Sequence, residues 1–197
     1  MNRPTARGGA VAAVAGLALA LASALPAQAA DSTVTESQWL TDVAAVTGPA
    51  QTYIDSRAAA NTSGAKQAIV LDIDNTSLET YFEGGYPTPA TAPVLTLAED
   101  AHAKGVSVFF VSARTNLIDL ATSYNLKHVG YTVDGLYTRT LSQIASESVA
   151  DFKTSQRKAI EANGYDIIAN IGNNTTDLSG GYADTTYKLP DYDGLLD

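Results

Sequence analysis

The sequence predicts an α/β protein in which a parallel β-sheet is flanked by helices. Three apolar runs, at residues 67–72, 106–111 and 166–171, lead to this prediction because they are typical of strands buried on both faces. Helical patterns separate the runs, and strands that alternate with helices favour parallel pairing. In such sheets the functional groups gather at the carboxyl ends of the strands.

An N-terminal helical segment is expected at about residues 35–60, before the first strand. Gly48-Pro49 interrupts its pattern, and proline lacks the N–H group that a helix interior needs. We therefore predict two helices with a break near Gly48-Pro49. Their apolar faces carry Trp39, Leu40 and Val43 before the break, and Tyr53 and Ile54 after it.

The later elements alternate between helix and strand. Residues 79–93 contain two glycines and three prolines, so this stretch is predicted to be a loop or a very small insertion. Its aromatic residues Tyr81, Phe82 and Tyr86 can either pack the loop or form the rim of a pocket. The other expected elements are helices at about 94–104, 117–124 and 154–163, a short strand near Tyr131, and a last strand at 185–189.

Residues 1–29 have the pattern of a secretory signal peptide. Arg3 and Arg7 give a basic start, residues 10–25 are apolar, and residues 27–29 have the A-x-A form that signal peptidases cleave. We expect cleavage after Ala29, secretion, and a single domain over residues 30–197. The apolar run is short for a membrane anchor, so no membrane attachment is expected after cleavage.

Composition excludes several classes of partner. The chain has no cysteine, which rules out disulfide bonds and lipid-modified cysteine. Without Arg3 and Arg7, 10 of the 12 basic residues remain against 21 acidic ones, a net charge near −11. This charge argues against nucleic acid or an anionic membrane as a partner.

Polar side chains follow the predicted strands at the edge where chemistry is expected. Asp72 and Asp74 end the first strand, and two carboxylates crowded at a buried edge are unfavourable unless a cation or a proton shares the site. The other groups at this edge are Ser112, Arg114, Asn173, Asn174 and Asp177, with Lys153 just before the helix that leads to the third strand.

These residue types indicate a metal-assisted reaction on a phosphoryl group. Oxygen ligands without His or Cys suit Mg²⁺. A hydroxyl, backbone N–H groups and a lysine suit a phosphoryl group. One carboxylate can attack phosphorus while the other manages the proton, and a metal ion lets the two coexist.

Four stretches, in this order, resemble the motifs of the haloacid dehalogenase (HAD) superfamily. The chain looks most similar to subfamily IIIB, the secreted acid phosphatases of the class B/C type, a group that includes plant vegetative storage proteins. The resemblance covers about residues 67–190 and implies a Rossmann-like HAD fold. The four stretches are Asp72-Ile73-Asp74-Asn75-Thr76, Val111-Ser112-Ala113-Arg114, residues 152–157 and residues 170–178.

The resemblance implies a role for each site residue. Asp72 would be the nucleophile that forms an aspartyl-phosphate, and Asp74 would protonate the leaving oxygen and then activate water. Lys153 would neutralise charge on the transferring group. Ser112 and Arg114 would bind substrate, and Mg²⁺ would be held by Asp72, the main-chain carbonyl of Asp74, and Asn173, with support from Asp177.

Two departures from the family pattern stand out. The last motif of the family usually has an aspartate where this chain has Asn173, and the stretch between Thr76 and Val94 is short, which predicts a reduced cap. An amide brings no charge, so Mg²⁺ binding is expected to weaken by at least about a factor of ten. By this reasoning Asn173→Asp lowers the Mg²⁺ concentration that gives half-maximal activity.

Three function classes remain open from the sequence. The leading one is a secreted Mg²⁺-dependent phosphomonoesterase that acts on a small phosphomonoester substrate. The second is a non-catalytic binding or storage protein of the same fold, which Asn173 favours. The third is a receiver domain, which the export signal and the single residue between Asp72 and Asp74 disfavour. The sequence leaves the oligomeric state open.

Overall fold

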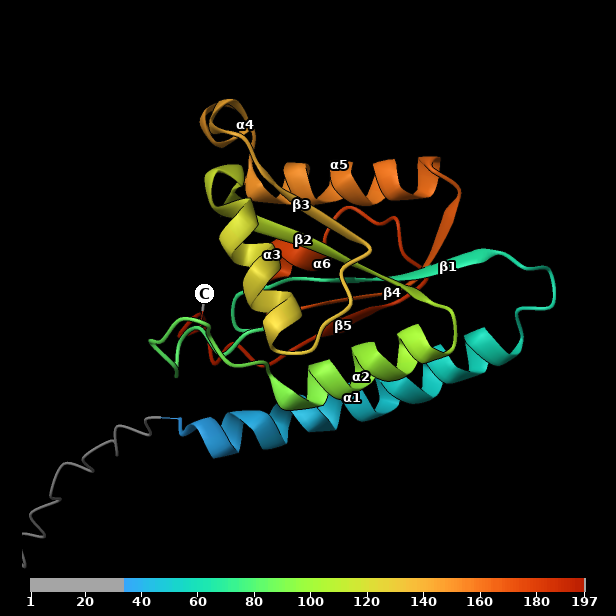
Figure 1. Ribbon diagram of the computed structural model, residues 1–197, viewed down its shortest axis with the longest axis horizontal. Coiled ribbons are helices and arrows are strands. Elements are labelled where there is room, and N and C mark those ends of the chain that lie inside the picture. The colour runs from blue at the N-terminus through green and yellow to red at the C-terminus, as the bar shows by residue number, and fades with distance from the viewer. Residues whose placement is uncertain (1–33, 197) are drawn as a thin grey trace, which may run out of the picture. The chain divides into compact units, whose positions relative to one another are not determined.

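A five-stranded parallel sheet forms the centre of the molecule, with strand order β3-β2-β1-β4-β5 (Figure 1). The computed structural model describes residues 34–196, and the predicted signal peptide at residues 1–29 lies outside the described residues. The strands are β1 Lys66–Leu71, β2 Ser107–Thr115, β3 Gly135–Arg139, β4 Tyr165–Gly172 and β5 Thr186–Lys188.

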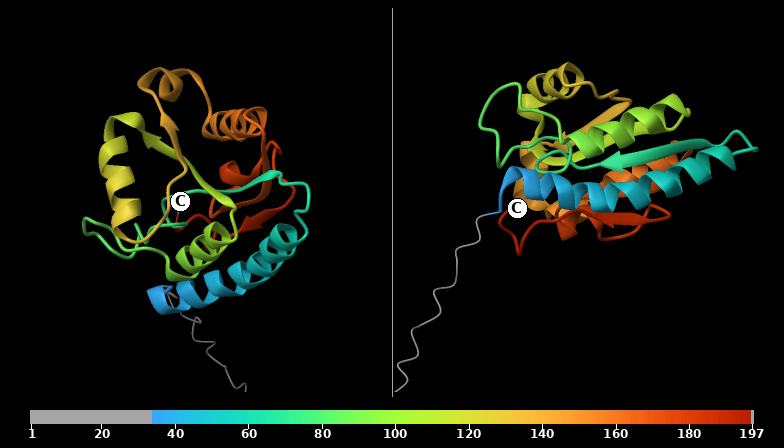
Figure 2. Two further views of the ribbon diagram at one scale, coloured as in Figure 1. Left: turned by 45° about the vertical axis from the view of Figure 1, so that its right-hand side comes forward. Right: turned by 90° about the horizontal axis from the view of Figure 1, so that it is seen from below.

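Helices cover both faces of this sheet, so the predicted α/β architecture is confirmed. α1 and α2 lie on one face and α5 lies on the other (Figure 2). Side chains alternate along a strand, so Ile69 and Leu71 of β1 enter the first layer while Ala68 and Val70 enter the second. The helices are α1 Glu36–Ala59, α2 Ala92–Ala103, α3 Asp119–His128, α4 Leu141–Ser146, α5 Val149–Ala162 and α6 Thr175–Leu178, with a 3₁₀ turn, η1, at Asn116–Ile118.

The predicted break at Gly48-Pro49 is wrong, because α1 is one helix of 24 residues that contains Pro49. Proline removes one helical hydrogen bond, but burial of an apolar side chain contributes roughly 1.5–3 kcal/mol, and several such side chains lie along the helix. The buried side chains recur every three or four positions on both sides of Pro49. Packing against α2 and the sheet therefore keeps α1 helical across Pro49. The buried side chains are Trp39, Val43, Thr47, Ala50 and Ile54.

The short strand predicted near Tyr131 is also wrong, since the edge strand β3 begins at Gly135. Tyr131 is instead a core residue, whose ring meets that of Phe110 edge to face with centroids 5.4 Å apart. Its hydroxyl donates to the carbonyl of Ser77 at 2.9 Å. Tyr131 is therefore buried because its ring packs against Phe110 of β2, and not because it belongs to a strand.

The helix predicted at about 154–163 begins earlier, at Val149. Ser148 caps it, since its hydroxyl accepts the Asp151 N–H at 3.1 Å. Lys153 therefore lies inside α5, where its side chain is held by a rigid element, and not before the helix as predicted. The short helices α4 and α6 were not predicted.

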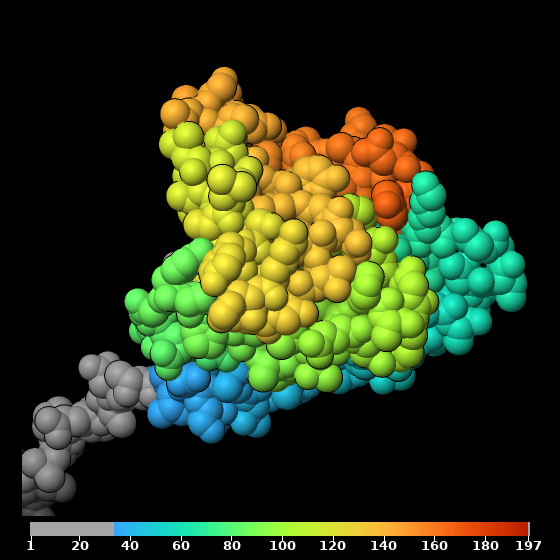
Figure 3. Space-filling model, in the orientation of Figure 1, coloured from blue at the N-terminus to red at the C-terminus, as the bar shows by residue number. Residues whose placement is uncertain are grey.

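The stretch between β1 and α2 forms a loop, which confirms the predicted reduced cap. It contains turns and two isolated bridges, one between Asp74 and Leu78 and one between Leu78 and Ala90. The loop lies beside α3 (Figure 3), where the Tyr86 hydroxyl donates to the Ala121 carbonyl at 3.0 Å. In residues 34–196, no helix combines the length and the hydrophobicity that crossing a membrane requires.

Candidate active site

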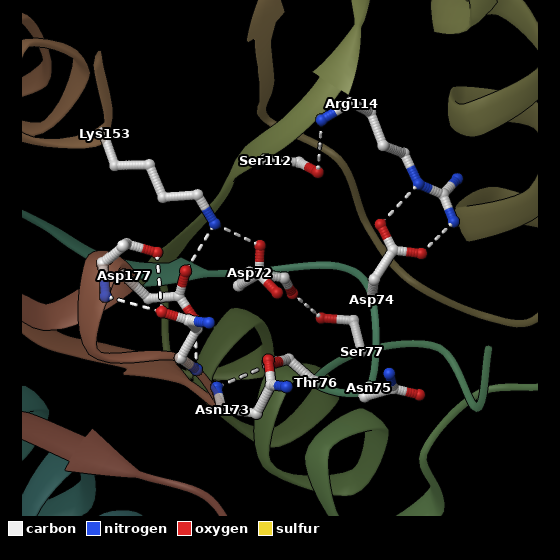
Figure 4. Close-up of polar contacts among 12 residues, drawn as sticks. Asp72, Asp74, Asn75, Thr76, Ser77, Ser112, Arg114, Lys153, Asn173 and Asp177 are labelled. Atoms are coloured by element: carbon white, nitrogen blue, oxygen red, sulfur yellow. Dashed lines mark hydrogen bonds and ion pairs between the residues drawn. The ribbon is translucent and has the colours of Figure 1, made fainter. Parts of the chain in front are cut away.

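A pocket of about 250 Å³ lies at the carboxyl ends of β1, β2 and β4. The loops after β1 and β4 supply polar side chains, β2 supplies Ser112 from within the strand, and α5 adds Lys153 (Figure 4). The pocket brings together seven of the side chains predicted from the sequence: Asp72, Asp74, Ser112, Lys153, Asn173, Asn174 and Asp177.

Asp72 and Lys153 form the buried centre of the pocket. The Lys153 Nζ lies 2.5 Å from Asp72 Oδ1 and 2.5 Å from Asp177 Oδ1, and all three side chains are at least nine-tenths buried. Burial raises the pKa of Asp72 to about 6, with Lys153 acting in the opposite direction. Burial also acts to lower the pKa of Lys153, but its two carboxylate partners outweigh burial and raise that pKa. Both groups are therefore charged at neutral pH.

Asp177 is tied into this centre by both of its carboxylate oxygens. Oδ1 faces Lys153, and Oδ2 accepts the Asn174 N–H at 2.8 Å in the capping box of α6. A Cβ atom at Gly172 would collide with the Asp177 side chain, so glycine is needed at the end of β4. Both carboxylate oxygens of Asp177 therefore have protein partners, and one of these partners is Lys153.

Arg157 fixes the main chain behind Asp177. It is fully buried and donates to the carbonyls of Asp177 at 2.6 Å, Gly181 at 2.9 Å and Ser179. Asn170 donates to the same Asp177 carbonyl at 2.9 Å. The loop after β4 is thus held from two sides by buried side chains.

Asp74 has a different environment from Asp72. Arg114 holds its carboxylate with two hydrogen bonds, at 2.9 Å from Nε and 2.7 Å from Nη2, and the Asp74 side chain is 44% exposed. Arg114 lies in an adjoining hollow of about 440 Å³, which shares Asp74 with the first pocket. The structure therefore places Arg114 beside the predicted acid–base residue and not with the residues that line the first pocket.

Ser112 is buried at the end of the apolar part of β2. Its hydroxyl accepts the Arg114 N–H at 3.2 Å, and no group in residues 34–196 accepts the Ser112 O–H, so this O–H can donate into the pocket. The serine therefore serves the local turn and the pocket at once.

Asn173 is buried and both ends of its amide have partners. Its Oδ1 accepts from the Thr76 hydroxyl at 3.1 Å, and its Nδ2 donates to the carbonyl of Leu196 at 2.9 Å. The Asn75 amide donates to the same carbonyl at 2.8 Å. Leu196 also lines the pocket, and the sequence analysis did not predict it. It acts through its main-chain carbonyl, which every residue type has, so the sequence does not mark this position.

The donor atoms fit a hard cation with a low ligand charge. In residues 34–196, no three Asp, Glu, His or Cys side chains converge as a metal cluster, because Lys153 lies between Asp72 and Asp177. Within this part of the chain, the second oxygen of Asp72 has no hydrogen-bond partner, and the Asn173 oxygen accepts a single one. One carboxylate and one amide oxygen are ligands that Mg²⁺ accepts together with water and phosphate oxygens.

Solved structures with the same fold include an acid phosphatase. The chain is similar to the class C acid phosphatase from Bacillus anthracis, with a TM-score of 0.58 and 22% identity over 74% of this chain and 67% of that one. The structure of the Bacillus anthracis enzyme with tungstate bound matches with a TM-score of 0.57 and 21% identity, over the same shares of the two chains. These likenesses support the fold assignment.

Sequence relatives and a family model narrow the assignment. The chain is 33% identical over 89 residues to the stem 28 kDa and stem 31 kDa glycoproteins of Glycine max. The match covers 44% of this chain but 35% and 31% of those proteins, so the chain spans about a third of their length. The model of the HAD superfamily, subfamily IIIB (acid phosphatase), matches residues 82–195. As the motifs predict, the chain belongs to subfamily IIIB of the HAD superfamily.

Proposed function

We propose that the protein is a secreted, Mg²⁺-dependent phosphomonoesterase that forms an aspartyl-phosphate on Asp72. Family membership supports a phosphatase, and the signal-peptide pattern of residues 1–29 supports secretion. The observation that carries the mechanism is the position of Asp72, a buried carboxylate that shares a pocket with a buried lysine and a serine hydroxyl.

The first step is the attack of Asp72 on phosphorus. A bond forms between the Asp72 carboxylate and phosphorus while the bond from phosphorus to the leaving oxygen breaks. Lys153 lies 2.5 Å from Asp72, so its positive charge offsets the charge on the transferring group. The free O–H of Ser112 donates to a phosphate oxygen.

Asp74 carries the proton in both steps of this mechanism. It protonates the leaving oxygen, and the resulting carboxylate then takes a proton from the water that hydrolyses the aspartyl-phosphate. The fork of Arg114 directs the Asp74 carboxylate through two hydrogen bonds. Arg114 is therefore a positioning residue for Asp74.

Mg²⁺ completes the site in this proposal, held by Asp72, Asn173 and the main-chain carbonyl of Asp74. When bound, it supplies positive charge that lets the carboxylate and the phosphate approach each other. The bulk charge of the protein is strongly negative, so a local excess of positive charge is needed before a phosphate dianion can bind.

A non-catalytic binding protein is the second candidate, and Asn173 favours it. The amide brings no charge to the site, and both of its ends are occupied by the protein. In this alternative the pocket binds phosphate groups without turnover.

Hydrolysis of 4-nitrophenyl phosphate by residues 30–197, with and without Mg²⁺, distinguishes the two candidates. We expect Mg²⁺-dependent turnover that Asp72→Asn lowers by at least about a thousandfold. Asp166→Asn is the matched control, because Asp166 lies at the start of β4, at the opposite edge of the sheet. A folded natural protein that hydrolyses nothing at any Mg²⁺ concentration would favour the non-catalytic candidate.

A further inference from the structure

The last described residues return to the active site after β5. The Leu189 N–H donates to the Gly172 carbonyl at 2.9 Å, which starts this return beside the end of β4. The Tyr192 hydroxyl then donates to Asp42 of α1 at 2.7 Å. The last described residues, next to the mark C, lie at the same edge of the sheet as the loop that follows β1 (Figure 1).

This segment, residues 191–196, ends at Leu196, which is buried inside the molecule. Its N–H donates to the Asp191 carbonyl at 3.1 Å, and its side chain is 1% exposed in the main apolar core. Its main-chain carbonyl accepts two hydrogen bonds, from Asn75 at 2.8 Å and from Asn173 at 2.9 Å. One carbonyl therefore joins the loop that carries Asp72 and Asp74 to the loop that carries Asn173.

Each of the two asparagines uses both the oxygen and the nitrogen of its amide, so each position depends on an amide. The Asn75 oxygen accepts the Tyr81 N–H at 2.7 Å while its nitrogen donates to Leu196. The Asn173 oxygen accepts from Thr76 while its nitrogen donates to Leu196. An ionised aspartate at either position can accept hydrogen bonds but cannot donate them. It would therefore place a carboxylate oxygen next to the buried Leu196 carbonyl oxygen, and the two acceptors would repel each other.

We propose that residues 191–196 form a fixed wall of the active site, and that Asn75 and Asn173 are positioning residues that hold it through the Leu196 carbonyl. Asn173 must donate to this wall as well as offer an oxygen to the pocket, a pair of tasks that aspartate cannot perform. Asn173→Asp then releases the wall and does not improve Mg²⁺ binding, which is the opposite of the expectation from the sequence. The role of the wall in turnover rests on the proposed function, whereas the clamp itself rests on the contacts.

Hydrogen–deuterium exchange of the metal-free protein tests the clamp directly. We expect Asn75→Asp and Asn173→Asp each to speed exchange of the Leu196 N–H at least about tenfold, which is the change for losing roughly 1.4 kcal/mol of local stability. Asn170→Asp is the matched control, since Asn170 makes a buried amide hydrogen bond of the same length to a different carbonyl, that of Asp177. It should speed exchange around α6 and leave residues 191–196 unchanged.

The double variant sharpens the test, because both amides share one acceptor. The change in the free energy of exchange of the Leu196 N–H in Asn75→Asp/Asn173→Asp should differ from the sum of the changes in the two single variants. Unchanged exchange at residues 191–196 in the folded single variants would overturn the clamp, and so would an equal effect of Asn170→Asp. If Asn173→Asp does not fold, Asn75→Asp decides the question alone, since it has the same acceptor.

Mg²⁺ titration by calorimetry and activity forms the second arm. We expect Asn173→Asp to leave Mg²⁺ affinity unchanged or weaker, together with the faster exchange of the wall. If Asn173→Asp binds Mg²⁺ tenfold more tightly and exchange at residues 191–196 is unchanged, Asn173 is only a weaker metal ligand than aspartate, and the clamp is wrong. If no variant hydrolyses a phosphate ester, the proposed function fails, while the exchange measurement still decides whether the clamp exists.

Discussion

Asp72 and Asp74 are two residues apart, yet their environments differ in almost every respect. The Asp72 side chain is 8% exposed and faces a lysine that is 4% exposed, whereas Asp74 is 44% exposed and faces an arginine at its side. Burial raises the pKa of Asp72 to about 6, because the buried carboxylate is poorly solvated. A poorly solvated carboxylate is a more reactive nucleophile than a well-solvated one. Asp74 can reach solvent and the adjoining hollow. These two environments fit the proposed roles, which are nucleophilic attack for Asp72 and proton transfer for Asp74.

The largest expected effect concerns the two aspartates themselves. Asp72→Asn should lower turnover of every phosphomonoester by a similar factor, because the bond to phosphorus cannot form. Asp74→Asn should cost roughly 10²–10⁴-fold for alkyl phosphates and much less for aryl phosphates with acidic leaving groups, which need no protonation. Steady-state rates over a series of leaving groups check this, and equal leaving-group dependence in both variants would contradict the division of roles.

Removing the cation from each pair should separate the two environments by stability. Lys153→Met leaves Asp72 and Asp177 buried without a counter-charge, and we expect a loss of about 3 kcal/mol in the free energy of unfolding. Arg114→Ala leaves Asp74 exposed to water, and we expect a loss of about 1 kcal/mol or less. Urea unfolding measures both, and comparable losses would show that the two sites are equally buried in solution.

The hollow beside Asp74 predicts a smaller effect on substrate choice. Tyr86 is 62% exposed and lines this hollow with Asp74 and Arg114. With no cap domain inserted after β1, few other groups can contact the leaving group, so varied phosphomonoesters should be accepted with modest discrimination. Tyr86→Ala should raise KM for aryl phosphates several-fold, by loss of aromatic contact worth about 1 kcal/mol, and leave KM for small alkyl phosphates unchanged. Equal changes for both substrate types would remove Tyr86 from the substrate site.

The last predicted effect lies in the loop that follows this pair of aspartates, and it depends on pH. Burial, followed by nearby Glu36 and Glu83, raises the pKa of Glu79 from 4.5 to about 7. Between these two values the folded protein holds a proton that the unfolded chain releases, so this residue's contribution to stability falls as the pH rises. We expect the Tm of the natural protein to decrease more between pH 5 and pH 8 than that of Glu79→Gln, measured by circular dichroism. Parallel decreases in the two proteins would argue against a raised pKa.

The sequence predicts the sheet and the edge that holds the site, because these depend on local patterns. The apolar run that ends at Asp72 is long and buried on both faces, so its end is visible in the sequence. Gly48-Pro49 misleads because tertiary packing along α1 outweighs a local preference. The position of Lys153 inside α5 depends on a cap at Ser148 that the periodicity does not mark.

The contacts that give each site residue its environment are not visible in the sequence. The pairing of Arg114 with Asp74 depends on where the β2 strand ends relative to β1. The clamp on Leu196 uses a main-chain carbonyl, and any residue type supplies one. Asn173 therefore looks like a lost metal ligand in the sequence, whereas the structure shows an amide with two partners.

The most direct test of the account is to locate the phosphoryl group on the enzyme during turnover. The natural protein, mixed with an aryl phosphate and Mg²⁺ and quenched in acid within milliseconds, should carry a phosphoryl group on the peptide that contains Asp72, as read by mass spectrometry. Asp74→Asn should accumulate more of this adduct, because hydrolysis of the intermediate loses its base. A phosphoryl group on another residue, or turnover at the natural rate by Asp72→Asn, would contradict the assignment of Asp72 as the nucleophile.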